Sequence, residues 1–267
     1  MKALRQLMDL SGRAALITGG AGHLGRAMAE ALAELGVAVA LLDLDPETCR
    51  QAAAELESAW GRPSLGLACD LAREDQLRAA PGRVLEAFGR LDILVNCAAF
   101  VGTSGLEGWV TPFAQQSPAT WRAALEVNLT APFVLSQACA PALAAGGRGA
   151  IINIASIYGL LGPDMDLYEG TAMGNPAAYA ASKGGLIQLT RWLATVLAPQ
   201  VRVNCISLGG IERGQPAVFQ QRYAARTPLG RMGVEEDIKG AAAYLASDLS
   251  AYVTGHNLVV DGGWTTW

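Results

Sequence analysis

The chain has 267 residues, a formal net charge of −4 at pH 7, and hydrophobic residues at 51% of its positions. This length fits one large α/β domain or two small ones, and the apolar fraction is enough for a sizeable core. The slightly acidic balance and the scattered basic residues argue against a nucleic-acid partner and against a basic membrane-binding face.

Short β-branched, apolar runs alternate with helical patterns along the chain. Strands are predicted at 14–18, 37–43, 64–70, 91–99, 149–156, 201–207 and 257–263, and helices at 23–36, 46–60, 73–89, 117–145, 177–198 and 234–247. Pro81 should disturb the helix at 73–89. The strands are apolar throughout rather than alternating, which is typical of buried parallel strands.

Strands separated by helices imply βαβ units with right-handed crossovers. The sequence therefore predicts a single-domain Rossmann fold over residues 1–267, with a doubly wound, parallel, seven-stranded sheet and helices on both faces. No linker, repeat or low-complexity segment divides the chain. Two irregular stretches, 157–176 and 209–230, are the candidate substrate loops, because ligands of such sheets bind beyond the carboxyl ends of the strands.

The compartment is predicted from the cysteines and from the lack of targeting signals. The cysteines are odd in number, lie in or beside apolar runs, and form no C-x-x-C pair. Reduced thiols in a cytoplasmic protein explain this pattern, and only two histidines are available to join them, so we expect no metal site. The first residues lack the apolar core of a signal peptide, and we expect no membrane span because no apolar run reaches roughly 18 residues.

The stretch LITGGAGHLGR, residues 16–26, follows the first predicted strand and resembles three glycine patterns. Gly20, Gly22 and Gly25 give G-x-G-x-x-G. The frame T-G-x-x-G-x-x-G uses Gly19 instead of Gly20, and T-G-x-x-x-G-x-G requires a glycine where the chain has His23. All frames bring bare backbone to a helix N-terminus, where free N–H groups favour a pyrophosphate. Downstream motifs favour the last frame, so we expect His23 in the first helical turn, next to the pyrophosphate, with an allowed φ.

Asp43 closes the second predicted strand, 18 residues after Gly25. A carboxylate at this position can accept hydrogen bonds from both adenosine ribose hydroxyls of NAD and would repel the 2′-phosphate of NADP. No Arg or Lys follows it in DLDPET or lies within residues 19–25, which favours NAD. Alternatively, Asp43 or Asp45 caps the helix that begins at Pro46, a role for which Asp45 is better placed.

The stretch YAASK places Tyr179 and Lys183 four residues apart, near the start of a predicted helix. This spacing puts both side chains on one face. A tyrosine, with an unperturbed pKa of about 10, is a poor base near neutrality, and a nearby ammonium makes its phenolate accessible. Only three of the 20 basic residues are lysines, so a lysine at this position is informative. The alternative is an exposed pair on an amphipathic helix.

Ser156 ends the strand at 149–156, and Asn128 lies within the long helix at 117–145. A serine hydroxyl can hold a substrate oxygen beside the tyrosine, and an asparagine that interrupts a helix can anchor a water in a proton path. Each residue also has a structural explanation: a strand-end turn for Ser156 and a helix–helix hydrogen bond for Asn128.

Together these residues resemble the short-chain dehydrogenase/reductases over essentially the full chain. The stretches that carry the resemblance are ITGGAGHLG, LLDLD, CDLA, LVNCAA, VNLTAPF, IINIAS, YAASKGG, RVNCIS and YVTGHNLVVDGG. The resemblance implies a catalytic set of Asn128, Ser156, Tyr179 and Lys183. It implies NAD contacts, besides Tyr179 and Lys183, at Gly19, His23, Leu24, Gly25, Asp43, Asp70 (adenine), Leu71, Asn96, Ala98 and Ile211 (nicotinamide). It also implies a homotetramer or homodimer paired through the helices at 117–145 and 177–198.

The sequence departs from the family's usual pattern beside the expected site. Ser156 and Tyr179 are 23 positions apart, against a usual gap of about a dozen, so the extra residues must form a wall beside the active site. Tyr168 has the usual spacing from Ser156, but it is not expected to be the base because position 172 is alanine. Arg213 replaces a common threonine and could pair with a carboxylate or phosphate of the substrate.

The two irregular stretches contain the candidate substrate contacts Tyr158, Tyr168, Glu169, Asn175, Glu212 and Arg213. Such a lining is polar for a steroid or fatty-acyl pocket and favours a sugar-like polyol or amino sugar, unless most of these charges face solvent. The stretches YEGTAMGNP, GGIERGQP and RTPLGRMG are weakly similar to dehydrogenases of bacterial surface-sugar and flagellin-glycan synthesis.

The expected reaction is NAD-dependent interconversion of a secondary alcohol and a ketone on a small-molecule substrate. One alternative is a nucleotide-sugar epimerase or dehydratase with bound NAD, which the T-G-x-x-G-x-x-G frame suggests. Such enzymes commonly carry a further substrate domain, whereas this chain ends at VVDGGWTTW, just after the last predicted strand. Another alternative is a non-catalytic NAD-sensing protein.

Overall fold

The computed structural model describes residues 1–102 and 104–267, and these residues contain one seven-stranded parallel sheet. The strands are β1 (Ala14–Thr18), β2 (Ala38–Asp43), β3 (Ser64–Ala68), β4 (Ile93–Asn96), β5 (Gly149–Ser156), β6 (Val201–Leu208) and β7 (Asn257–Val260). Their order is β3-β2-β1-β4-β5-β6-β7, and each neighbouring pair is parallel. The direction of winding reverses between β1 and β4, which confirms the predicted doubly wound Rossmann fold and places a ligand site at their carboxyl ends.

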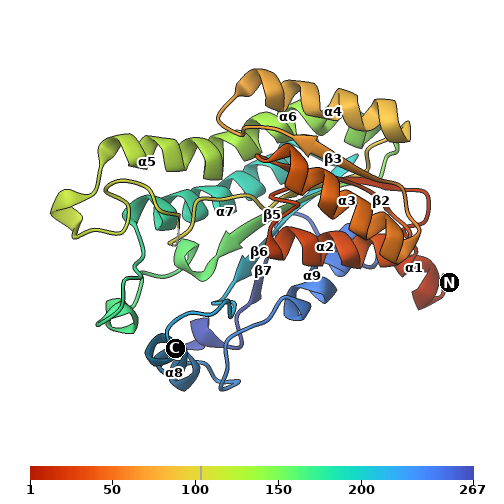
Figure 1. Cartoon of the computed structure of the whole chain (residues 1–267). Helices are drawn as coiled ribbons and strands as arrows, with labels where there is room; N and C mark the ends of the chain where they lie inside the picture. Colours follow the sequence, from red (N-terminus) through yellow and green to blue (C-terminus); the bar gives the residue numbers. More distant parts are fainter. Residues whose placement is uncertain (103) are drawn as a thin grey trace.

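The helices form a layer on each face of the sheet (Figure 1). One layer holds α2 (His23–Glu34), α3 (Pro46–Trp60) and α9 (Glu236–Ala246), whereas the other holds α4 (Glu74–Phe88), α6 (Ala131–Ala145) and α7 (Ala177–Leu197). Fully buried side chains such as Met28 on α2 and Leu245 on α9 pack on the first face, and Leu77 and Leu135 pack on the second. Each such side chain contributes about 1.5–3 kcal/mol by leaving water.

One continuous helix runs from Pro118 to Ala145 through α5 (Pro118–Leu125), the π-helical turn η2 (Glu126–Thr130) and α6. By its length and its mean hydropathy of 1.2 alone, this helix is long and apolar enough to cross a membrane. In the structure 44% of its apolar window is buried, and the helix packs against α4 and α7. A core helix of an α/β sheet has this environment, so packing accounts for its composition.

In the part of the chain that the structure describes, the remaining elements are two shorter helices and several 3-10 turns. The short helix α1 (Leu4–Met8) precedes β1, and α8 (Ala217–Arg226) lies within the predicted loop at 209–230; neither helix was predicted. The other predicted loop contains the 3-10 turns η3 (Ile157–Gly159) and η4 (Met165–Tyr168). Figure 1 shows α8 close to the C-terminus, at the carboxyl end of the sheet.

The helix α4 continues through Pro81 instead of being interrupted there. Pro81 lacks the N–H that would bond to the carbonyl of Leu77, but both residues are buried against the sheet. Burial of this face of α4 offsets the lost hydrogen bond. Helix propensity read from the local sequence does not include this packing, so it predicted an interruption.

Candidate active site

The glycine loop after β1 reveals which glycines the backbone requires. Gly19 has φ +64°, and a Cβ on Gly25 would lie 2.0 Å from the Gly19 carbonyl oxygen. A Cβ on Gly20 would lie 2.9 Å from Leu41. Gly22, in contrast, has only the Gly19 oxygen at 3.3 Å and a φ of −82° that any residue adopts. The loop therefore depends on the first and last glycines of the chosen frame and on Gly20, and it does not require Gly22.

His23 is the first residue of α2, which follows Gly22 as N-cap. No described residue other than glycine has a positive φ, so His23 is not left-handed, as predicted. Its side chain is exposed and its Nδ1 lies 3.6 Å from Glu235 Oε1. The backbone of His23 is thus part of the helix N-terminus, where an anion is favoured.

Asp43 and Asp45 have different roles at the end of β2. The Asp43 carboxylate accepts hydrogen bonds from the backbone N–H groups of Ala21 (3.2 Å) and Leu44 (2.8 Å). Asp45 is the N-cap of α3 and accepts from the Thr48 N–H at 2.7 Å. The capping explanation therefore applies to Asp45, and Asp43 is joined to the glycine loop.

The other predicted cofactor residues lie at strand ends in the same region. Asp70 follows β3 and accepts from the Ala72 N–H, next to Leu71. Asn96 is buried and its Nδ2 donates to Asn153 Oδ1 at 2.8 Å, so its side chain links β4 to β5. Ala98 donates its N–H to Thr18 Oγ1 and packs against Gly19.

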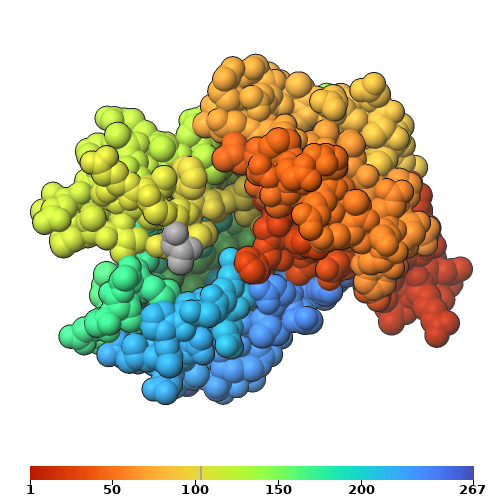
Figure 2. Space-filling model, in the orientation of Figure 1, coloured from red at the N-terminus to blue at the C-terminus, as the bar shows by residue number. Residues whose placement is uncertain are grey.

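A cavity of about 600 Å³ opens at the carboxyl ends of β4, β5 and β6. Its lining includes Ser156, Tyr179 and Lys183 of the predicted catalytic set, together with the predicted cofactor residues His23, Leu24 and Ile211. Figure 2 shows the surface hollowed where segments from the N-terminal quarter, the middle and the C-terminal part of the chain meet. The structure thus brings three of the four predicted catalytic residues and part of the predicted cofactor site to one cavity, whereas Asn128 is not among the residues that line it.

Lys183 is 3% exposed, which excludes the alternative of a solvated surface pair. Its Nζ donates to the Ile154 carbonyl oxygen at 2.8 Å and lies 5.7 Å from the centroid of the Tyr179 ring. Burial lowers the pKa of Lys183 to about 8, because the ammonium loses hydration. The backbone of α7 at Lys183 packs directly against Gly159, which follows β5. A side chain at position 159 would prevent this contact, since a Cβ there would lie 2.7 Å from the Lys183 carbonyl carbon.

Tyr179 is the reactive candidate beside Lys183. Burial raises the pKa of Tyr179, and the interaction with the Ser156 hydroxyl and the charge of Arg213 act in the opposite direction. Ser156 is buried at the end of β5, and its Oγ accepts from the Tyr158 N–H at 3.2 Å. A phenol and a hydroxyl are therefore held together at one end of the cavity, where both can contact a single substrate oxygen.

Asn128 is buried within the π-helical turn η2. Its Oδ1 accepts from the Phe100 N–H at 2.7 Å, and its Nδ2 donates to the Phe100 carbonyl and to Ser182 Oγ, both at 3.1 Å. The side chain thus joins the segment after β4 to α7, as the structural explanation predicted. Pro132 has no N–H for the Asn128 carbonyl four residues earlier, so this carbonyl lacks its α-helical donor.

The inserted segment forms one wall of the cavity. Tyr168 Oη donates to Tyr158 Oη at 2.9 Å, and both residues line the cavity with Asn175. Burial raises the pKa values of both tyrosines, so they stay neutral. Glu169 and Glu212, also predicted substrate contacts, are exposed and do not line this cavity.

Packing holds this wall in place. Tyr168 belongs to a small apolar cluster with Phe219 and Tyr223 of α8 and Trp264 near the C-terminus. The rings of Tyr223 and Trp264 stack with centroids 4.3 Å apart, and Tyr223 Oη accepts from the Gly210 N–H. Sequence reasoning missed Phe219 and Tyr223 as lining residues, although their i, i+4 spacing after Pro216 is a helical signal.

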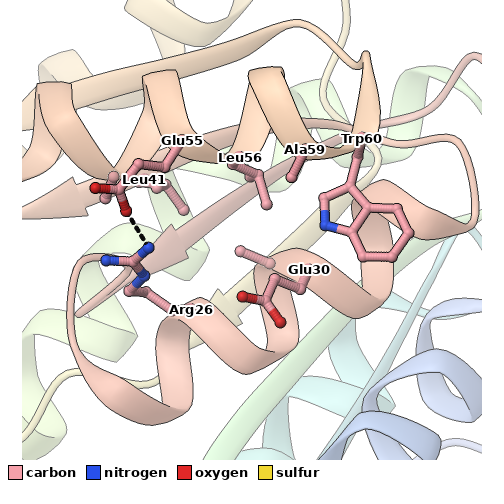
Figure 3. Close-up of a pocket in the computed structure, with 9 residues that line it drawn as sticks. Arg26, Glu30, Leu41, Glu55, Leu56, Ala59 and Trp60 are labelled. Atoms are coloured by element: carbon pink, nitrogen blue, oxygen red, sulfur yellow. Dashed lines mark hydrogen bonds and ion pairs between the residues drawn. The ribbon is translucent and has the colours of Figure 1, made fainter.

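A second, smaller hollow lies between α2 and α3 (Figure 3). Its volume is about 150 Å³, and Figure 3 shows Arg26 paired with Glu55 across it. Glu30, also in its lining, pairs with Lys239 at 2.7 Å. Its charged groups are therefore satisfied within the protein, and none of the predicted site residues lines it.

Comparison with known proteins agrees with this geometry. A family model described as enoyl-(acyl carrier protein) reductase matches residues 19–265. The chain is 34% identical over 258 residues to cis-4-hydroxycyclohexanecarboxylate dehydrogenase from Sinomonas cyclohexanicum, which covers 95% of this chain and 96% of that protein. It is 36% identical over 262 residues to D-threitol dehydrogenase from Mycolicibacterium smegmatis, covering 96% of this chain and 94% of that protein. The chain belongs to the short-chain dehydrogenase/reductase family.

A solved member of this family has the same architecture. The gluconate 5-dehydrogenase from Burkholderia cenocepacia J2315, in complex with NADP and tartrate, superposes with a TM-score of 0.88 at 32% identity and covers 99% of this chain and 100% of that one. These relatives are dehydrogenases that act on alcohols or ketones. As a member of the same family, the chain is an oxidoreductase that binds a nicotinamide cofactor.

The glycine loop gives a matched pair of variants. Gly25→Ala should destabilise the protein by at least about 1–3 kcal/mol, because the new methyl group meets the Gly19 carbonyl. Gly22→Ala should change the free energy of unfolding by less than about 0.5 kcal/mol, because φ and space permit a side chain there. Chemical unfolding without cofactor measures both. Equal effects of the two substitutions would contradict this assignment of the loop.

The buried Lys183 predicts a pH dependence of stability. Its pKa is about 8 in the folded chain, against 10.5 for an unperturbed lysine, so between these values the unfolded chain binds more protons. Wild-type stability should therefore rise with pH over this window relative to Lys183→Met, by up to about 3 kcal/mol. Urea unfolding of both proteins from pH 7 to 10.5 measures the difference; parallel curves would show that the ammonium is not desolvated.

Proposed function

We propose that this protein interconverts a secondary alcohol and a ketone with NAD, on a small, polar, hydroxylated substrate. The observation that carries the proposal is the convergence of Ser156, Tyr179 and Lys183 at one cavity beside the glycine loop. The relatives support the range of substrates to test, since they are named for a hydroxycyclohexanecarboxylate, a tetritol and a sugar acid.

The residues around the glycine loop fit a dinucleotide. The loop packs so closely that Gly25 and Gly20 admit no side chain, while the space at Gly22 stays open in front of the helix N-terminus. The backbone N–H groups at the start of α2 would hold the pyrophosphate, and Ile211 and Lys183 line the cavity further along. When bound, the nicotinamide ring supplies the hydride acceptor or donor.

The chain's own residues handle the proton and the orientation of the substrate. Ser156 Oγ would hold the substrate oxygen next to the Tyr179 phenol. Tyr179, as phenolate, would take the hydroxyl proton during oxidation, and as phenol it would donate a proton to the ketone oxygen during reduction. Its raised pKa keeps the phenol protonated in the free protein, which is the state that donates to a ketone. Lys183 would add positive charge below the phenol, held by the Ile154 carbonyl.

Asn128 is proposed as a positioning residue for this set. Its side chain fixes Phe100 beside the cavity and Ser182 on α7, one residue before Lys183. Its carbonyl, which lacks an α-helical donor because of Pro132, is available to accept from a water in a proton path. The π-helical turn is the local structure that permits both roles.

We propose NAD rather than NADP because of Asp43. Its carboxylate sits at the end of β2, held by the Ala21 and Leu44 N–H groups, where an adenosine ribose binds in this fold. Arg26 and Arg50, the nearest arginines along the chain, pair with Glu55 and Glu47. The described residues therefore offer a ribose acceptor and no free guanidinium from these positions for a 2′-phosphate.

We also propose a homotetramer or homodimer, as the family resemblance implies. Exposed apolar side chains on the two long helices support it, with Trp121 and Phe133 on the helix at 118–145 and Trp192 and Val196 on α7.

Removal of the Tyr179 hydroxyl tests the reaction. Tyr179→Phe should lower turnover by about 10²–10⁴-fold, because proton transfer is lost, and should leave the Kd for NADH unchanged. The assay follows NADH absorbance with cis-4-hydroxycyclohexanecarboxylate, D-threitol and D-gluconate, and NADH binding is measured by fluorescence. Tyr252→Phe, at a fully exposed tyrosine, is the control. Turnover retained by Tyr179→Phe would refute the assignment.

The cofactor preference is tested at Asp43. The wild-type kcat/KM should be at least about tenfold higher with NAD⁺ than with NADP⁺, because the 2′-phosphate of NADP⁺ would lie next to the Asp43 carboxylate and be repelled by it. Asp43→Asn should reduce this ratio. Asp45→Asn, at the helix cap two residues away, should lower stability and leave the ratio unchanged. A wild-type preference for NADP⁺ would contradict the proposal.

A further inference from the structure

The described lining of the large cavity contains basic residues without acidic counterparts. Lys183 lies at its inner end, His23 is on the cofactor side, and Arg213 is on the loop between β6 and α8. Among the described residues that line the cavity there is no Asp or Glu. A cavity with this charge favours a ligand that carries a negative group.

Arg213 differs from neighbouring arginines in having no partner within residues 1–102 and 104–267. Arg226 pairs with Asp164, and Arg231 forms two hydrogen bonds with Asp237. Arg213 forms a hydrogen bond only through its backbone N–H, and its side chain is exposed at the cavity wall. Its guanidinium is therefore available to a ligand with its full set of donors.

Local hydrogen bonds hold the Arg213 backbone in place. The Arg213 N–H donates to Gln215 Oε1 at 2.6 Å, and Gln215 Nε2 donates to the Ile211 carbonyl at 2.7 Å. Ile211 in turn forms a bridge with Gly233. This loop presents Arg213 on the cavity side, and its positive charge reaches the Tyr179 phenol, whose pKa it lowers against the effect of burial.

The inserted segment brings neutral hydroxyl groups to the same cavity. Tyr158 and Tyr168 stay protonated because burial raises their pKa values, and Tyr168 donates to Tyr158. One hydroxyl proton lies between the two phenol oxygens, and the other is left to donate to an oxygen in the cavity. The cavity lining thus matches a ligand that has both hydroxyl oxygens and an anionic group.

We propose that Arg213 binds the carboxylate of the substrate, and that the preferred substrates are hydroxy acids rather than neutral polyols. This inference rests on the proposed function and specifies the substrate class. The cofactor pyrophosphate also has the chemistry to bind a guanidinium. However, the glycine loop follows β1, and Arg213 follows β6, three strand positions away or about 14 Å. The Arg213 loop also continues directly into the wall formed by Gln215, Pro216 and Phe219.

Matched substrates test the inference. Threonate and threitol differ only in a terminal carboxylate or alcohol, and gluconate and glucitol form a second such pair. The wild-type kcat/KM should favour each acid by at least tenfold. Arg213→Gln should lower the acid-to-neutral ratio of kcat/KM by about 10- to 100-fold, because a charge-assisted, bidentate interaction with the acid is lost, whereas its effect on the Tyr179 phenol acts on both substrates alike. Arg213→Lys should keep part of the preference. Arg83→Gln, at an exposed arginine of α4, is the control.

A binding measurement separates the possible sources of the anion. Calorimetry of threonate and threitol with the Tyr179→Phe protein saturated with NADH reports substrate binding without turnover. It should give tighter binding of threonate, which Arg213→Gln on this background removes. If Arg213→Gln instead raises the Kd for NADH and weakens acid and neutral substrates equally, the guanidinium binds the cofactor and the inference is overturned.

The proposed function and this inference fail in different ways. Equal wild-type activity on acids and neutral polyols would overturn the role of Arg213 and leave the oxidoreductase intact. Intact NADH binding with no turnover of any alcohol would remove the proposed function, and the inference would fall with it.

Discussion

The site depends on the hydrogen bond between the Lys183 ammonium and the Ile154 carbonyl, which joins α7 to β5 in the interior. A buried ammonium without such a partner would be strongly unfavourable, so this contact fixes the rotation of α7 against the sheet. Tyr179 lies one turn earlier on the same helix, and Ser156 lies two residues later on the same strand. The phenol and the hydroxyl therefore meet because one charged side chain is anchored between their two elements.

Glycines allow helices and strand ends to pack this closely around the site. Bare backbone at Gly159 lies against Lys183, and bare backbone at Gly25 lies against the Gly19 carbonyl. In both places a strand end meets a helix with no room for a methyl group. This close packing brings the N-terminus of α2 to one side of the cavity and Tyr179 and Lys183 of α7 to another.

Electrostatics differ between the two ends of the ligand site. Asp43 lies beside the glycine loop and gives that end a negative charge, whereas Lys183 and Arg213 give the cavity a positive field. Burial shifts the pKa of Lys183 down and that of Tyr179 up. Both shifts reduce the charge inside the protein, because burial disfavours the charged form of each group.

The sequence determined the strand and helix pattern, the strand-end position of Ser156 and Asp43, and the pairing of Tyr179 with Lys183, because these depend on periodicity and short spacing. It did not reveal which residues the Asn128 side chain bonds to, the continuation of α4 through Pro81, or Tyr223 in the cavity wall, since packing between distant segments decides them. It named Glu169, Glu212 and Arg213 together as candidate substrate contacts, with Arg213 as a possible partner of a carboxylate or phosphate, and it did not show which of the three line the cavity. Only the tertiary structure separated them, because the fold of each loop sets whether a charge faces solvent or the cavity.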